Sequence, residues 1–170
     1  AARWRGAGFR VGCGLFELVD RAGVKKVMDH VKAARCKGAK HVAGSVPEGD
    51  NGNFVGPVRI AGVTRDMQLC EDETFGPLAA VIKFDTEEEA LEIANDTPYG
   101  LAAYFYSTNI HRVWRVADEL EAGIIGVNEG AVSNAAAPFG GVKESGLGRE
   151  GSSHGIEEYM EIKYLCMGAQ

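Results

Sequence analysis

Residues 78–127 decide the fold, and they read LAAVIKFDTEEEALEIANDTPYGLAAYFYSTNIHRVWRVADELEAGIIGV. Short apolar runs alternate here with amphipathic stretches. The pattern predicts three strands and two helices in alternating order, at 78–84, 86–95, 101–106, 110–120 and 124–127. This order is typical of a layer in which neighbouring strands run parallel, so we expect an α/β fold with a parallel sheet.

Local signals support these elements. Thr86 is followed by Glu89 at the spacing of a capping box, which predicts a helix start. In the second helix, Ile110, Val113 and Trp114 recur at helical spacing and form one apolar face. The run 78–84 is compact and apolar, which predicts a buried strand.

Upstream of this layer, residues 21–36 predict another amphipathic helix. Val24, Val27 and Val31 recur there at helical spacing. Gly38 follows directly and is a typical residue for ending a helix.

Three further stretches are predicted to be extended. Residues 41–43 form a short strand, and residues 54–63 form irregular chain because glycine and proline interrupt them. A strand that begins at Tyr159 and ends at Cys166 alternates apolar and polar side chains. That period of two predicts one half-buried face.

The composition is that of a globular protein. The 170 residues are 45% hydrophobic and 25% charged, with a net charge of −6. No apolar run approaches the roughly 20 residues needed to cross a bilayer, so we expect no membrane span. Residues 1–40 carry 10 Lys and Arg against 3 Asp and Glu. Four of these cations interleave with the helix pattern without an aromatic residue among them, so we expect a solvated helix face and no nucleic-acid partner; they are Lys25, Lys26, Lys32 and Arg35.

The cysteines and histidines predict neither a disulfide framework nor a metal site. The four cysteines form no C-x-x-C pair, which favours a reducing compartment. No secretory signal is visible, so we expect an intracellular location, in the cytoplasm or the mitochondrial matrix. His30, Cys36 and His41 lie close together in the sequence, but their spacing matches no familiar zinc pattern.

Residues 73–77, Glu-Thr-Phe-Gly-Pro, directly precede the first predicted strand. One interpretation is that a carboxylate and a ring, Glu73 and Phe75, are displayed where both could touch a ligand. The other is a solvated acidic turn with Phe75 tucked into the core. The residue pattern leaves both open.

Residues 128–151 are rich in glycine and show little periodicity, which is typical of a functional loop. They include Gly146-Leu147-Gly148-Arg149-Glu150-Gly151, which matches G-x-G-x-x-G. The residues before it are loop-like rather than a strand, so we do not interpret it as a dinucleotide fingerprint.

The two motifs carry a family resemblance. Residues 73–77 resemble the Glu-x-Phe-Gly-Pro motif of the aldehyde dehydrogenase superfamily, and residues 138–150, PFGGVKESGLGRE, resemble its C-terminal signature. Asn128-Glu129-Gly130 and the chain's ending most resemble succinate-semialdehyde dehydrogenases. The resemblance implies three segments: a thinly matching one, a partial catalytic domain and an oligomerisation strand, at residues 1–22, 23–155 and 156–170.

The resemblance also implies roles for four residues. Glu73 matches the carboxylate that accepts hydrogen bonds from the nicotinamide ribose, and Phe75 matches the ring beside the nicotinamide of NAD or NADP. Ser133 falls where a serine faces the substrate carboxylate, and Phe139 matches a ring at the aldehyde pocket. The implied substrate is a small aldehyde, with succinate semialdehyde oxidised to succinate.

The catalytic residues of the family have no match here. None of the four cysteines has the surroundings of the family's nucleophile, and Cys13 in particular is rejected. We therefore expect no catalytic residue in this chain and no activity from it alone. The alternative hypothesis is a non-catalytic interaction module. Under either hypothesis, the strand between Tyr159 and Cys166 is expected to join subunits into a homo-oligomer.

Overall fold

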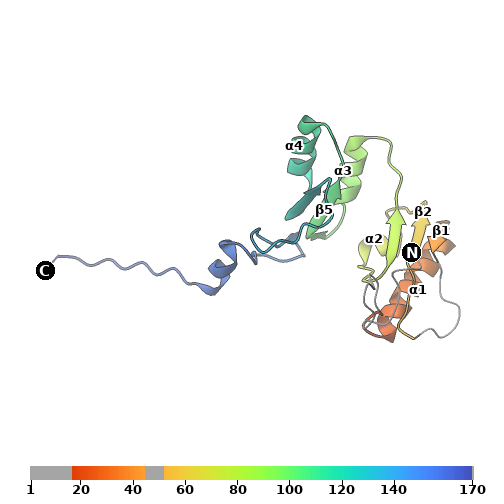
Figure 1. Cartoon of the computed structure of the whole chain (residues 1–170), viewed down its shortest axis with the longest axis horizontal. Helices are drawn as coiled ribbons and strands as arrows, with labels where there is room; N and C mark the ends of the chain where they lie inside the picture. Colours follow the sequence, from red (N-terminus) through yellow and green to blue (C-terminus); the bar gives the residue numbers. More distant parts are fainter. Residues whose placement is uncertain (1–16, 45–51, 170) are drawn as a thin grey trace. The chain divides into compact units, whose positions relative to one another are not determined.

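The computed structural model describes residues 17–44 and 52–169 (Figure 1). The chain divides into two compact units, Ala1–Asp85 and Thr86–Gln170. Each unit is described by itself. None of the helices within the described ranges is long and apolar enough to cross a membrane.

Unit 1 begins with helix α1, Arg21–Cys36, as the valine spacing predicts. Asp20 caps it, because its carboxylate accepts a hydrogen bond from Gly23 N at 2.7 Å. Gly38 follows the helix with φ of +100°, a conformation that suits glycine. One face of α1 is buried, and it carries Val27, His30, Val31 and Ala34.

Within the described residues of unit 1, the sheet has three strands in the order β1 (Lys40–Gly44), β2 (Val58–Ala61) and β3 (Leu78–Val81). β1 pairs antiparallel with β2, and β2 pairs parallel with β3. The short helix α2, Gln68–Glu71, lies between β2 and β3 in the sequence. Val31 from α1, Ile60 from β2 and Met67 before α2 belong to one buried cluster, so the helix packs on the sheet.

Unit 2 contains the remaining helices and strands. Those of its first half are α3 (Glu87–Asn95), β4 (Tyr99–Gly100), β5 (Ala102–Phe105) and α4 (Ile110–Glu119). Those of its second half are β6 (Ile124–Val127), β7 (Val142–Lys143) and the 3₁₀ helix η2 (His154–Tyr159). β5 pairs parallel with β6, which confirms the predicted parallel relationship of these two strands. β4 and β7 form a separate antiparallel pair.

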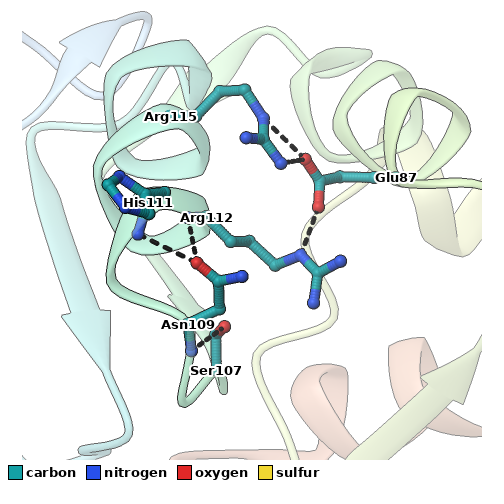
Figure 2. Close-up of polar contacts among 6 residues, drawn as sticks. All are labelled: Glu87, Ser107, Asn109, His111, Arg112 and Arg115. Atoms are coloured by element: carbon teal, nitrogen blue, oxygen red, sulfur yellow. Dashed lines mark hydrogen bonds and ion pairs between the residues drawn. The ribbon is translucent and has the colours of Figure 1, made fainter.

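Polar side chains fasten α3 to α4. Thr86 caps α3 by accepting a hydrogen bond from Glu89 N at 3.1 Å, as the capping signal predicts. Figure 2 shows that Glu87 points from α3 towards α4, where it pairs with Arg112 and Arg115. Asn109 caps α4 by accepting from the amides at the helix start, also drawn in Figure 2.

Two strand predictions need correction. The run 78–84 does form a strand, β3, but it pairs with β2 and not with β5 or β6. The three strands expected in one parallel sheet therefore lie in two sheets. β3 is also largely exposed rather than buried, and among the described strands it pairs with β2 alone. Sequence periodicity reports apolar character, whereas pairing depends on residues far away in the chain.

The end of the chain also departs from its prediction. Residues 160–169 belong to no helix or strand, and no described residue pairs with them in a ladder. Side chains on both faces are exposed: Ile162 is fully exposed, and Leu165, on the opposite face, is 74% exposed. The half-buried strand is therefore not formed within this chain, because a ladder needs a neighbouring strand. The association of this segment with another subunit stays a prediction.

Candidate functional site

The loop at residues 73–76 of unit 1 alternates between two environments. Glu73 and Phe75 are exposed, the latter by 77%, whereas Thr74 and Gly76 are partly buried. Successive side chains of an extended chain point to opposite sides. The carboxylate and the ring therefore share the outer face of the loop. This excludes the interpretation in which Phe75 is tucked into the core of this unit.

The inner face of the same loop lies against α1. His30 Nδ1 is 2.5 Å from Thr74 Oγ1, and the His30 side chain is buried. A Cβ atom at Gly76 would lie 2.6 Å from Val27 Cγ2, so the loop approaches α1 as closely as a glycine permits. Burial, reinforced by the charge of Lys26, lowers the pKa of His30, which keeps the imidazole neutral at neutral pH.

The outer face of this loop has chemistry suited to a nucleoside. Among the described residues, Glu73 has no hydrogen-bond or ion-pair partner, so its carboxylate oxygens are open to a ligand. An ionised carboxylate is an acceptor with no donor, which matches the two hydroxyl donors of a ribose. The exposed ring of Phe75, two residues away, offers a flat apolar surface for a heterocycle. The residues present therefore fit a nicotinamide nucleotide.

The glycine-rich loop of unit 2 begins where β6 ends, at Asn128. This residue has φ of 54°, and its backbone N–H donates to Phe105 O at 2.9 Å. The next residue, Glu129, folds back on the chain: Oε1 accepts hydrogen bonds from the amides of Gly130 and Ala131, both at 2.8 Å. These two amides lower the pKa of Glu129, so the carboxylate is held ionised in a local turn.

Ser133 lies on the exposed part of this loop. Its side chain has no partner among the described residues, so its hydroxyl is available to a ligand. The turn that follows it is ordered by Asn134, whose Oδ1 accepts from Ala136 N at 2.9 Å. Ser152 N donates to Ala135 O at 3.0 Å and ties this turn to a later part of the loop.

Phe139 is held in place by its backbone. It forms an isolated antiparallel bridge with Glu150, with both N–H···O distances at 2.8 Å. Arg149, next to Glu150, donates through Nη1 to Gly141 O and Gly148 O, each at 2.7 Å. Phe139 and Arg149 line an open cavity of about 300 Å³ together with Tyr159. The backbone bridge to Glu150 and the hydrogen bonds from Arg149 therefore hold Phe139 and the residues that follow it in place.

Among the described cysteines, Cys70 does not offer an activated thiol. Cys36, Cys70 and Cys166 are free. Burial raises the pKa of Cys70, whose Sγ also donates to Thr64 O at 3.5 Å. A raised pKa disfavours the thiolate, which is the nucleophilic form. Cys13 lies outside the described residues.

The four residues predicted from the resemblance thus fall into two groups. Glu73 and Phe75 share one face in unit 1, and Ser133 and Phe139 lie on one loop in unit 2, with no described bond joining Ser133 to Phe139. From the sequence, His30 is considered only as a possible metal ligand together with Cys36 and His41. Among the described residues, no cluster that could hold a metal occurs. The signal that the sequence analysis missed is the position of His30, three residues after Val27 and four before Ala34. This spacing places it on the buried face of α1.

Comparisons with known proteins match nearly the whole chain. The model of the aldehyde dehydrogenase family matches residues 10–165. Succinate-semialdehyde dehydrogenase, mitochondrial, of Rattus norvegicus is 53% identical over 163 residues, which are 96% of this chain and 31% of the relative. Glutarate-semialdehyde dehydrogenase of Pseudomonas aeruginosa is 49% identical and covers 96% of this chain and 34% of the relative.

The structural comparison agrees. The crystal structure of succinate-semialdehyde dehydrogenase from Burkholderia pseudomallei matches with a TM-score of 0.92 and 48% identity, over 99% of this chain and 35% of that one. The chain thus spans about a third of the length of the relatives it matches. Those relatives have the names of enzymes, so the alternative of a non-catalytic interaction module finds no support.

Proposed function

We propose a function from one premise: this chain belongs to the aldehyde dehydrogenase family, whose model matches residues 10–165. Members of this family are NAD(P)-dependent. The chain forms part of an enzyme that oxidises a semialdehyde, with succinate semialdehyde converted to succinate. The observation that carries the proposal is the outward pairing of Glu73 and Phe75 on the loop whose sequence matches the family motif.

The loop of residues 73–76 binds the cofactor, NAD or NADP. Glu73 accepts hydrogen bonds from the nicotinamide ribose, and Phe75 packs beside the nicotinamide ring. The bound cofactor supplies the hydride acceptor of the reaction. The exposure of both side chains and the absence of any described partner for Glu73 support these roles.

The loop of unit 2 binds the substrate. The hydroxyl of Ser133 donates a hydrogen bond to the carboxylate that distinguishes a semialdehyde from a simple aldehyde. Phe139 forms part of the apolar wall around the aldehyde end. The exposed, unpartnered hydroxyl of Ser133 and the braced backbone of Phe139 support this assignment.

The test uses a complete enzyme. In a chimera, this chain replaces the matching 163-residue stretch of the rat succinate-semialdehyde dehydrogenase. We expect Glu73→Gln to raise the KM for NAD or NADP about tenfold, because hydrogen bonds to a charged group contribute about 1.5–3 kcal/mol. Glu71→Gln, a nearby exposed carboxylate on α2, is the matched control. An unchanged cofactor KM in Glu73→Gln contradicts the proposal.

The substrate role has a separate readout. Ser133→Ala is expected to raise the KM for succinate semialdehyde about tenfold and to leave the KM for propanal, which has no carboxylate, unchanged. Ser153→Ala, another exposed serine of the same unit, is the control. Equal effects on both aldehydes would show that Ser133 does not contact the carboxylate.

We also propose that the segment between Tyr159 and Cys166 adds to the sheet of another subunit. Its extended course and its exposed side chains on both faces support this, because such a segment has its backbone groups open to a neighbouring strand. Truncation after Gly155 is expected to lower the oligomeric mass measured by light scattering. An unchanged mass would exclude the role.

A further inference from the structure

We propose that His30 is a positioning residue for the cofactor: through its hydrogen bond to Thr74, it directs Glu73 and Phe75 outward. This role rests on the proposed function of the loop at residues 73–76. His30 itself does not contact a ligand. It acts on the loop from the buried face of α1.

The first step is the burial of His30. Its side chain is 2% exposed, and it is the one buried polar side chain among residues 17–44 and 52–169. A buried polar group without a partner destabilises a fold, so such groups are nearly always hydrogen-bonded. Here the partner is Thr74, which lies 44 residues further along the chain. The bond therefore connects a helix of the core to the middle of the loop.

The second step is the position of Thr74 between the two ligand-facing residues. Burial alternates at residues 73–75, from exposed to partly buried and back to exposed, so a Thr74 held inward leaves Glu73 and Phe75 facing outward. Gly76 provides a second close approach, since a Cβ built there would lie 2.6 Å from Val27 Cγ2. Val27 and His30 lie one helical turn apart on α1. Two contacts on one rigid helix thus fix the direction of the short segment between them.

The third step is the protonation state of the His30 imidazole, which forms the bond. A neutral imidazole has one donor and one acceptor nitrogen, and a threonine hydroxyl can both donate and accept, so the pair is satisfied in either tautomer. Around His30 lie the charges of Lys26 and Asp29 on α1 and of Asp72 beside the loop. Burial and Lys26 outweigh the two carboxylates, and the pKa is lowered. At neutral pH the bond to Thr74 is therefore made by the neutral imidazole.

The test measures loop order in this chain by amide hydrogen exchange at Asp72 and Leu78, whose hydrogen-bonded amides flank residues 73–76. His30→Ala and Thr74→Val each remove one side of the bond, and each is expected to speed exchange about threefold to tenfold. The double variant should add little, because both changes remove the same interaction. His30→Asn, which places a polar group near the position of Nδ1, should restore slow exchange.

A matched control separates positioning from general destabilisation. Val31→Ala alters the neighbouring buried residue of α1, which belongs to the core cluster with Ile60 and Met67. It is expected to lower overall stability without selectively speeding exchange at Asp72 and Leu78. If Val31→Ala speeds loop exchange as much as His30→Ala does, the positioning role is wrong. Thr74→Val keeps the test decisive if His30→Ala does not fold, because Thr74 is only partly buried.

A kinetic readout in the rat chimera distinguishes this inference from the proposed function. Thr74→Val and His30→Ala should raise the KM for the cofactor about threefold to tenfold and leave the KM for succinate semialdehyde unchanged. If Glu73→Gln does not change the cofactor KM, the proposed function fails. If Glu73→Gln raises it but Thr74→Val and His30→Ala change neither that KM nor loop exchange, the positioning role alone fails.

Discussion

Asn128 binds Ser107 through both ends of its carboxamide. Oδ1 accepts from Ser107 N at 2.9 Å, and Nδ2 donates to Ser107 O at 2.8 Å. Because Asn128 also donates from its backbone to Phe105, the ends of β5 and β6 are joined where the loop carrying Ser133 begins. Asn128 has a positive φ of 54°, a backbone conformation that asparagine tolerates better than most residues.

Asn128→Ala should lower the free energy of unfolding by about 2–3 kcal/mol. Two hydrogen bonds of about 1 kcal/mol each are lost, and alanine is strained in the left-handed region by about 1 kcal/mol. Urea denaturation of the chain measures the change. Asn128→Gly loses the same bonds without the strain, so it should cost about 1 kcal/mol less. Equal stabilities for both variants and the parent would show that the bonds contribute nothing.

Gly123→Ala should disrupt the loop that holds Phe139. A Cβ at this position would lie 2.1 Å from Gly140 O, so backbone must move. We expect a loss of at least about 2 kcal/mol in unfolding free energy, together with shifted amide resonances at residues 139–141. Gly130→Ala is the control, because nothing lies within 4 Å of its Cβ position. A Gly123→Ala variant as stable as Gly130→Ala would contradict this packing.

Stability should depend on pH through His30. Its pKa is lowered below 6.5 by burial and by Lys26, against Asp29 and Asp72. The unfolded state therefore binds more protons between the two pKa values. The stabilising contribution is complete above pH 6.5 and is lost as the pH falls through that window towards the folded-state pKa. Urea midpoints across this range should fall less steeply in His30→Asn than in the parent; identical slopes would contradict the prediction.

Glu87 should support unit 2 in a salt- and pH-dependent way. Hydrogen bonds from Arg115 and Arg112, with Nε distances of 2.9 and 2.6 Å, lower the pKa of this carboxyl below 4.5. Its contribution is therefore complete above pH 4.5 and is lost as the pH falls through the lowered pKa. Glu87→Gln should lower the Tm near neutral pH, and added salt should narrow the difference.

Glu88→Gln is the control for this prediction. It removes the same charge from the first turn of α3 but leaves the ion pairs of Glu87 with Arg112 and Arg115 in place. Calorimetry measures both variants. If Glu87→Gln and Glu88→Gln shift the Tm equally, the effect is one of net charge, and the bridge to α4 contributes nothing specific.

The helices could be predicted from the sequence because their signals are local. The valine spacing of α1 and the capping signal at Thr86 lie within the elements themselves. Sheet partners could not be predicted, because pairing is a property of distant segments. β3 pairs with β2, whose neighbourhood contains Gly56 and Pro57 and was expected to be irregular.

The candidate site shows the same difference between local signals and contacts between distant segments. Glu73 and Phe75 were identified by a contiguous motif, and their shared face follows from the period of an extended chain. The support of that loop by His30 depends on a contact across 44 residues, which no local pattern reports. Asn128 was recognised only as part of a resemblance, because its bonds to Ser107 and its positive φ exist only in the folded chain.

The turn at Glu129 has a consequence for proton transfer near the glycine-rich loop of unit 2. A carboxylate whose charge is stabilised by the amides of Gly130 and Ala131 is a weak base. With its pKa lowered below 4.5, it stays ionised near neutral pH and is a poor proton acceptor there. Glu129 instead contributes a constant negative potential to its surroundings, and the pH-rate profile of the complete enzyme should carry no inflection from it.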